Sequence, residues 1–359
     1  MTPARPQRIT IAVLSVAVVL GCTAQSGSDQ NALSRVDATY SAPLPAGAKV
    51  VPASTAAAPQ ADQSCNPTAS LRPIPPPAAA PPPPPPAPGQ PPAPPAPPVA
   101  PATPASAGPT LATIVARGRL VVGVDQNTYL FGFRNPKTGL LEGFDVDVAR
   151  EMARGILGDP DKIQFQALTS AQRVPALQSG QVDMVVRSMT ITCERLKDVA
   201  FSTVYFQANQ RVLARTDSGI REAADLGGKR ACATTGSTSV STLLALKPAP
   251  TVYGVADWTD CLVMLQQGDV DAVSTDDSIL VGLQDQDPYL RVVGASLSPE
   301  PYGIGLNRSA GDLVRFVNGV LDRMRTDGTW RQITPGGCPP SAPRLRHRPR
   351  PTATEPEDP

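Results

Sequence analysis

The side chains that most often perform catalysis or bind metals are scarce in this 359-residue chain. Its single histidine, His347, lies in a Pro- and Arg-rich tail. The rest of the sequence therefore excludes a Ser-His-Asp triad, a Cys-His dyad and a His-ligated zinc site. The six cysteines show no C-x-x-C spacing, so redox chemistry and metal binding have little support. These residues favour a ligand-binding protein over an enzyme, with no cofactor and no metal.

One cysteine is placed for lipid attachment. Cys22 follows two arginines and the apolar run 9–20, which has the length of a signal-peptide core. A small residue directly before the cysteine is typical of lipoprotein signals, although Leu20 is bulkier than the usual residue there. We predict that residues 1–21 are a signal peptide and that Cys22 carries a lipid anchor at the extracytoplasmic face of the cell membrane. The alternative is an uncleaved short anchor.

The other five cysteines are interpreted as structural, because disulfides persist outside the cytoplasm. Cys338 lies in the low-complexity tail and is the natural unpaired residue. Cys232 ends an apolar run and Cys261 opens a helix about 30 residues later, which makes them the preferred local pair. Cys65 is then left to pair with Cys193. The two other pairings of these four cysteines stay open.

Prolines divide the chain into segments. Twenty of the 43 prolines fall within residues 73–109, which favours a polyproline II linker. The residues before it, 22–72, are a polar extracytoplasmic segment without periodicity. The proline run is interpreted as a stalk that holds the domain off the membrane. If Cys65 pairs with Cys193, however, the run becomes a closed loop and the tether shortens to residues 23–64.

Residues 110–334 have the composition of a globular domain. They carry 23 Lys and Arg against 25 Asp and Glu, a net charge of −2. This balance excludes a generally basic nucleic-acid-binding surface. The segment beyond the domain, 334–359, is Pro- and Arg-rich and is predicted to be a disordered tail.

Short apolar runs alternate with amphipathic stretches along the globular part. Strands are expected at 120–124, 163–167, 182–186, 229–233 and 270–274, and helices at 146–157, 171–179, 236–246, 257–267 and 312–325. This alternation predicts βαβ units and an open α/β sheet. Because the pattern restarts near Arg221, we expect two lobes, 110–213 with 300–333 and 214–299, with a ligand cleft at the hinge between them.

A series of motifs in the same order resembles the extracellular solute-binding proteins of family 3, the polar-amino-acid receptors of ABC importers. The motifs are GFDVDVA at 143–149, RVPALQSG at 173–180, MTITCER at 189–195, FSTVY at 201–205, GSTS at 236–239 and DAVSTDD at 271–277. The resemblance covers residues 111–333 and is greatest to mycobacterial and actinobacterial glutamate/glutamine-binding lipoproteins. It implies a bilobed, type II periplasmic-binding-protein-like fold. It also implies a monomer that delivers a polar amino acid to an importer permease.

The sequence departs from the family after Trp330. The family continues with a helix, whereas here Thr334 and Pro335 follow closely, and proline stops a helix. The last helix is therefore expected to be short. This departure touches no motif assigned to the ligand.

The resemblance also implies a clamp for the carboxylate of the ligand. Arg195 would bind it bidentately, because a guanidinium matches a carboxylate and stays charged. Thr190 would offer its hydroxyl and backbone N–H to the same end. Ser237 and Thr238 follow Gly236 at a helix start, where backbone N–H groups favour anions.

The ligand ammonium needs acceptors and a negative charge. Asp276 resembles the ammonium-binding acid of the family, with Asp277 as its rival, and Ser188 would add a backbone carbonyl. A paired-carboxylate hydrolase using the two acids is not favoured, because adjacent strand residues point to opposite faces.

The side-chain end of the ligand is less defined by the sequence. Asp125, with Tyr129 or Phe133, is expected to line the first lobe. An acid at Asp125 suits an amide or a cation and opposes a carboxylate unless Arg187 or Arg134 neutralises it. Glutamate, aspartate, glutamine and asparagine therefore stay open as ligands.

Two other functions remain as alternatives. An amino-acid sensor that signals to a membrane protein would have the same ligand site. An enzyme on the same scaffold, such as a lytic transglycosylase or a dehydratase, would need a carboxyl group with a raised pKa as general acid. It would leave the clamp of Thr190, Arg195 and Asp276 unexplained.

Overall fold

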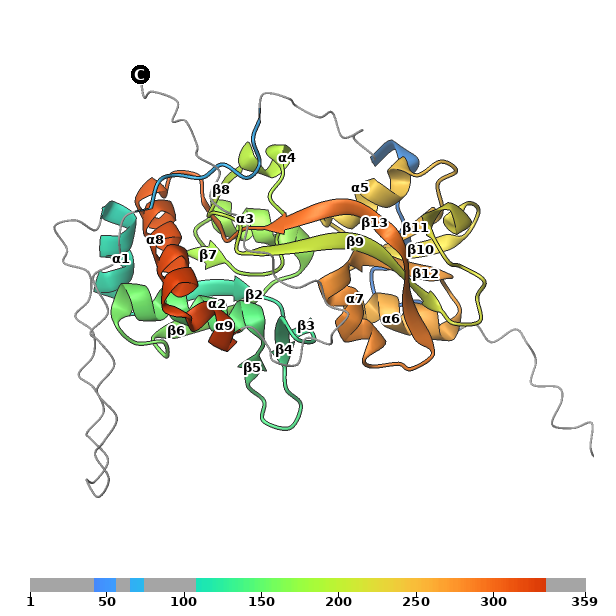
Figure 1. Cartoon of the computed structure of the whole chain (residues 1–359), viewed down its shortest axis with the longest axis horizontal. Coiled ribbons are helices and arrows are strands. Elements are labelled where there is room, and N and C mark those ends of the chain that lie inside the picture. Colours follow the sequence, from blue (N-terminus) through green and yellow to red (C-terminus); the bar gives the residue numbers. More distant parts are fainter. Residues whose placement is uncertain (1–41, 56–64, 74–107, 334–359) are drawn as a thin grey trace, which may run out of the picture. The chain divides into compact units, whose positions relative to one another are not determined.

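The computed structural model describes residues 42–55, 65–73 and 108–333 (Figure 1). The predictions for the signal peptide, the lipid anchor on Cys22, the proline run and the C-terminal tail lie outside these residues. No described helix is both long and apolar enough to span a membrane.

The first lobe is built on a five-stranded sheet in the order β6-β2-β7-β14-β8. β2 (Leu120–Val124) is buried at every position and runs parallel to β6 (Ile163–Ala167) and β7 (Met184–Val185). β14 (Gly305–Asn307) and β8 (Val199–Phe201) join by antiparallel pairing. Continuous burial is expected for a parallel strand covered on both faces, and the predicted bounds of β2 and β6 are confirmed.

Helices cover both faces of this sheet. Along β2, Leu120 and Val122 point into the larger core of the lobe, whereas Val121 points into a smaller one. The helices of the larger core are α1 (Pro109–Arg117), α2 (Phe144–Leu157), α8 (Gly311–Asp327) and α9 (Thr329–Ile333), and those of the smaller core are α3 (Arg173–Gln178) and α4 (Cys193–Leu196). A small sheet that the sequence did not predict consists of β3 (Asn127–Thr128), β4 (Gly132–Arg134) and β5 (Leu141–Glu142).

The second lobe has a six-stranded sheet in the order β1-β11-β10-β12-β9-β13. Its parallel strands are β10 (Arg230–Thr234), β11 (Thr251–Val255) and β12 (Ala272–Asp276), and the helices that follow them are α5 (Thr238–Ala245), α6 (Trp258–Gln267) and α7 (Asp277–Gln284). β12 ends at Asp276 and α7 begins at Asp277. The expectation that these two aspartates are adjacent strand residues is therefore wrong.

Two long antiparallel strands, β9 (Phe206–Arg215) and β13 (Leu290–Tyr302), connect the lobes (Figure 1). Phe206 belongs to the core of the first lobe, whereas Val212 belongs to the core of the second. The pairing of the two strands shifts register between Val293 and Ser298. Neither strand was predicted, although both cross the boundary at which a hinge was expected.

Residues before the proline run are part of the folded unit. β1 (Lys49–Val50) pairs antiparallel with β11 at the sheet edge, and the buried Val51 donates its N–H to the carbonyl of Val252 over 2.8 Å. On the first lobe, the Ser70 hydroxyl donates to the Phe201 carbonyl over 2.8 Å. The sequence pattern of residues 22–72 did not predict these contacts.

Both preferred disulfides, Cys65–Cys193 and Cys232–Cys261, are present in the structure. The second lies wholly inside the second lobe, with both cysteines fully buried. The first joins two partly exposed cysteines and attaches the N-terminal segment to the start of α4.

We predict that the two disulfides differ in their access to reductant. Titration of the native protein with dithiothreitol should open Cys65–Cys193 at concentrations that leave Cys232–Cys261 intact, because a buried bond needs local unfolding before a thiolate can attack it. Differential alkylation followed by peptide mass spectrometry measures both bonds in one sample. Reduction of Cys232–Cys261 first, or of both together, would contradict the buried position.

Candidate functional site

A polar cavity lies between the two lobes and has an empty volume of about 300 Å³, part of it open to solvent. It brings together most of the residues that the sequence analysis assigned to the ligand, but neither Tyr129 nor Phe133. The lining residues of the first lobe are Asp125, Ser170, Arg173, Arg187, Ser188, Thr190 and Arg195, and those of the second lobe are Ser237, Thr238, Trp258, Thr275, Asp276 and Ile279.

Strand ends place most of these side chains. Asp125 follows the last residue of β2, and Ser188 lies shortly after β7. Asp276 is the last residue of β12, and Ser237 lies between β10 and α5. Because the carboxyl ends of parallel strands lie at one edge of a sheet, each lobe presents one such edge to the cavity.

The Arg195 guanidinium contacts both lobes. Its Nη1 donates to the Thr190 carbonyl over 2.6 Å and its Nη2 to the Gly236 carbonyl over 3.0 Å. Burial lowers the pKa of Arg195, while the charges of Glu300 and Asp276 raise it. Arg195 thus brings a cation to the cavity with two acidic side chains close by.

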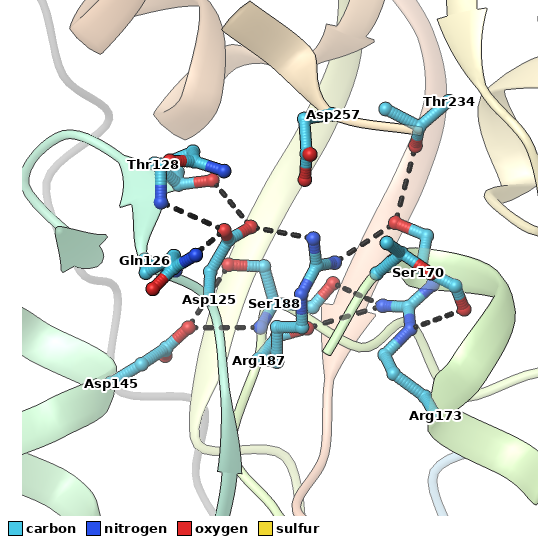
Figure 2. A network of polar contacts seen from close by, with 12 residues as sticks. Asp125, Gln126, Thr128, Asp145, Ser170, Arg173, Arg187, Ser188, Thr234 and Asp257 are labelled. Atoms are coloured by element: carbon cyan, nitrogen blue, oxygen red, sulfur yellow. Dashed lines mark hydrogen bonds and ion pairs between the residues drawn. The ribbon is translucent and has the colours of Figure 1, made fainter. Parts of the chain in front are cut away.

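Arg173 is a second arginine of the cavity, and the sequence analysis assigned it no role. It is buried and donates to the carbonyls of Arg187 over 3.1 Å and Ser188 over 3.2 Å (Figure 2). It also donates to the Gly236 carbonyl in the other lobe over 3.3 Å. Burial lowers its pKa well below the usual value, and the charge of Arg195 adds to this. Arg173 is the first residue of the motif RVPALQSG, and this position was the one feature of the sequence that could have pointed to a role at the site.

Asp125 forms a buried ion pair with Arg187, with 2.7 Å between the Arg187 Nη2 and the Asp125 carboxylate. The same carboxylate accepts the Thr128 hydroxyl over 2.7 Å and the backbone N–H of Gln126 over 2.7 Å. Figure 2 shows Arg187 between Asp125 and Ser170, whose hydroxyl accepts from Nη1 over 2.9 Å. The negative charge of Asp125 is therefore neutralised inside the protein.

The other candidates for this end of the cavity lie elsewhere. Arg134 donates to the Gly139 carbonyl over 2.9 Å and is not paired with Asp125. Tyr129 and Phe133 stack edge to face with 5.3 Å between their ring centroids, outside the residues that line the cavity. Asp257 points toward the ion pair from the second lobe (Figure 2), and burial and the charge of Asp125 raise its pKa.

Asp145 holds Ser188 in a strained conformation. The φ angle of Ser188 is 38°, in the left-handed region that non-glycine residues rarely adopt. The Asp145 carboxylate accepts the Ser188 N–H over 2.9 Å, the Ser188 hydroxyl over 3.1 Å and the Tyr205 hydroxyl over 2.7 Å. Burial raises the pKa of Asp145 to about 6. Asp145 belongs to the GFDVDVA motif but was not assigned to the site.

Asp276 carries a buried oxygen with an open acceptor position. Its Oδ2 accepts the Tyr302 hydroxyl over 2.6 Å, whereas its Oδ1 has no hydrogen-bond partner among the described residues. Burial raises the pKa of Asp276 well above its usual value, and the charge of Glu300 adds to this. Asp277, its predicted rival, accepts the N–H of Asn209 over 3.2 Å and does not line the cavity.

Two threonines of the cavity share a partner that the sequence analysis missed. The Thr190 hydroxyl donates to Glu300 Oε2 over 2.6 Å, and the Thr238 hydroxyl donates to the same oxygen over 2.9 Å. The Ser237 hydroxyl instead donates to the Thr234 carbonyl over 2.7 Å. Glu300 lies on β13, a strand that the sequence pattern did not reveal.

Comparison with known proteins agrees with this architecture. The family model of the bacterial extracellular solute-binding proteins, family 3, matches residues 120–335. The chain is 39% identical over 225 residues to the ABC transporter glutamine-binding protein GlnH of Bacillus subtilis, covering 62% of this chain and 82% of that protein. It is 31% identical over 240 residues to the glutamate-binding protein GluB of Corynebacterium glutamicum, covering 64% and 81%. These matches confirm the resemblance found in the sequence.

Solved structures give the same result for the fold. An ancestral arginine-binding protein bound to glutamine is 35% identical with a TM-score of 0.57, over 60% of this chain and 96% of that one. Holo ArgBP from T. maritima is 32% identical with a TM-score of 0.57, over 62% and 97%. The predicted bilobed, type II periplasmic-binding-protein-like fold is confirmed.

Asp145 should make stability depend on pH. Its pKa of about 6 in the folded state lies above the 3.8 of an ordinary aspartate, so the folded state binds this proton more tightly than the unfolded state. The free energy of unfolding should therefore rise by about 2 kcal/mol from this group as the pH falls from 7 to 4. Urea titrations of the wild type and Asp145→Asn at several pH values isolate the contribution of Asp145 to this pH dependence, since asparagine does not titrate. A stability difference between the two proteins that is independent of pH would contradict the assignment.

Proposed function

The chain belongs to the bacterial extracellular solute-binding proteins of family 3, and from this premise we propose that its cavity binds a free polar amino acid, with glutamine preferred. The observation that carries the proposal is the cavity itself. It holds a cation from one lobe, Arg195, and an acid with a vacant acceptor from the other, Asp276. A free α-amino acid carries the two complementary charges on one carbon.

The ligand carboxylate is assigned to Arg195 and to the start of α5. A guanidinium presents parallel N–H donors to a carboxylate, and each Nη of Arg195 carries a second N–H beyond the one that it donates to a backbone carbonyl. The backbone N–H groups of Ser237 and Thr238 lie at the N-terminus of a helix, which favours an anion. Thr190 adds a backbone N–H from the first lobe.

The ligand ammonium is assigned to Asp276 and to the backbone carbonyl of Ser188. An ammonium beside Oδ1 would supply the missing partner of that oxygen and would lower the raised pKa of Asp276. The strained Ser188 lines the cavity, where its carbonyl accepts from Arg173 and its N–H donates to Asp145. Strain at a ligand-contacting residue is characteristic of a preorganised site.

The side chain of the ligand is assigned to the subsite around Asp125 and Arg187. Because these two residues neutralise each other and Asp257 adds a second acid, a further carboxylate is disfavoured. A neutral amide can donate toward the acids and accept from an arginine. Buried Arg187 Nε has no hydrogen-bond partner among the described residues. Glutamine therefore fits better than glutamate, which agrees with a relative named as glutamine-binding.

In the cell, this receptor would deliver its ligand to the permease of an ABC importer. The relatives are solute-binding receptors rather than enzymes. We further propose that the chain acts as a monomer at the extracytoplasmic face of the membrane, held there by a lipid on Cys22. The same ligand site would serve a sensor, so the importer assignment rests on the family.

A thermal-shift screen with all twenty amino acids tests the ligand class. A ligand at 100 times its Kd should stabilise the protein by about 2.7 kcal/mol, and glutamine should give the largest shift. By titration calorimetry, glutamine should bind at least about tenfold more tightly than glutamate. In Asp125→Asn, Arg187 loses its ion-pair partner and is free to attract a ligand carboxylate. The preference for glutamine over glutamate, measured as the ratio of the two Kd values, should therefore shrink about tenfold. Equal or tighter glutamate binding by the wild type would overturn the preference.

Arg195 and Asp276 are predicted to carry opposite ends of the ligand from different lobes. Arg195→Lys keeps the charge but loses the two-pronged geometry, and Asp276→Asn keeps the shape but loses the charge. Each should weaken glutamine binding by about 30-fold or more, because Arg195→Lys removes the bidentate contact with the ligand carboxylate and Asp276→Asn leaves the ligand ammonium without an opposite charge. Asp277→Asn is the matched control and should bind within about threefold of the wild type, since Asp277 does not line the cavity. Loss of binding in the control with normal binding in Asp276→Asn would reverse the assignment.

A further inference from the structure

Glu300 is a buried carboxylate that contacts both lobes at once. It is 2% exposed and lies on β13, one of the two strands that connect the lobes. Oε2 accepts the Thr190 hydroxyl of the first lobe over 2.6 Å and the Thr238 hydroxyl of the second over 2.9 Å. Oε1 accepts the Ser298 hydroxyl on its own strand over 2.7 Å. One carboxylate thus holds a cavity residue from each side.

These contacts fix what the two threonine hydroxyls can offer a ligand. A hydroxyl has one proton and two lone pairs, and in both threonines the proton is donated to Glu300. Toward the cavity, Thr190 and Thr238 can therefore only accept with their side chains. Donation to a ligand carboxylate is left to backbone N–H groups and Arg195, whereas ligand N–H groups can bind the hydroxyl oxygens.

The same contacts favour closure without a ligand. Thr190 and Thr238 can share one oxygen only while the two lobes are close together. Other links between the lobes join Arg195 to the Gly236 carbonyl and Thr234 to the Ser170 hydroxyl, the latter over 3.1 Å. A protein whose binding-competent form is already populated loses less affinity to the closing step.

We propose that Glu300 is a positioning residue of the receptor: it orients the hydroxyls of Thr190 and Thr238 and biases the cleft toward its closed form. The part of this proposal that concerns the ligand rests on the proposed function. The part that concerns closure does not, so the two parts are tested separately.

The closure part is tested by hydrogen exchange on the full chain without a ligand. Glu300→Ala should speed amide exchange at least severalfold in residues 188–192 and 236–240, while β2 in the core of the first lobe is unchanged. The matched control, Ser296→Ala, changes an exposed residue of the same strand and should match the wild type. Wild-type exchange in both cavity segments of Glu300→Ala would overturn the proposal, whatever the protein binds.

The positioning part is tested by a double-mutant cycle with L-glutamine as the ligand. Glu300→Gln and Thr190→Val should each weaken binding about tenfold, and together about 10- to 30-fold instead of the 100-fold of independent effects. Thr190→Ser keeps the hydroxyl and should bind nearly as the wild type. Additive losses, or an unchanged Kd in Glu300→Gln, would overturn the positioning role. Failure of the wild type to bind any amino acid would overturn the proposed function instead, and the exchange experiment would still decide the closure role.

Discussion

The need to satisfy buried charge shapes the junction between the two lobes. Ionised side chains are tolerated away from water only when they are paired and hydrogen-bonded. Seven such groups gather around the cavity: Arg173, Arg187, Arg195, Asp125, Asp145, Asp276 and Glu300. Nearly all of their polar atoms contact other parts of the chain. Among these groups, Asp276 Oδ1 and Arg187 Nε have no hydrogen-bond partner in the described part of the chain. An unfilled acceptor in an otherwise satisfied buried network is a structural sign of a ligand.

The two-lobed fold supplies these groups at little conformational cost. Parallel strands bring Asp125 and Asp276 to the cavity as the chain leaves each sheet, so neither needs a long flexible loop. The exception is Ser188, whose left-handed backbone is held by Asp145 and Arg173. The connecting strands add Glu300, which therefore belongs to both lobes. The side chains proposed to bind the ligand, Thr190 and Thr238, are thus also the ones that Glu300 joins across the two lobes.

The sequence predicted what is local and missed what depends on distant partners. The apolar run of β2 was placed residue for residue, since continuous burial leaves a continuous apolar signature. Strand β9 alternates buried with more exposed positions in its first part and is buried continuously at Val212–Ala214, as it passes from one core to the other. Because neither pattern holds along the whole strand, the sequence did not reveal it. Glu300 bonds to Thr190 across 110 positions of the chain, and nothing in the adjacent residues indicates such a contact. The two disulfides match the preferred pairing, which rested on compartment, cysteine count and spacing, although two other pairings stayed open from the sequence.

The N-terminal segment changes how the domain would be held at the membrane. The family match begins at residue 120, so β1 lies before the part of the chain that the family model covers. β1 nevertheless pairs with the edge strand β11, whose edge would otherwise be open to pairing with other chains. The Cys65–Cys193 bond and the hydrogen bond from the Asn318 amide on α8 to the Leu71 carbonyl, over 2.7 Å, attach the following residues to the first lobe. The described residues on both sides of the proline run thus contact the same helix, α8, where Asp312 accepts the N–H of Thr110 over 2.8 Å. For the lipid anchor proposed on Cys22, attachment to the domain therefore begins no later in the chain than β1, ahead of the proline run.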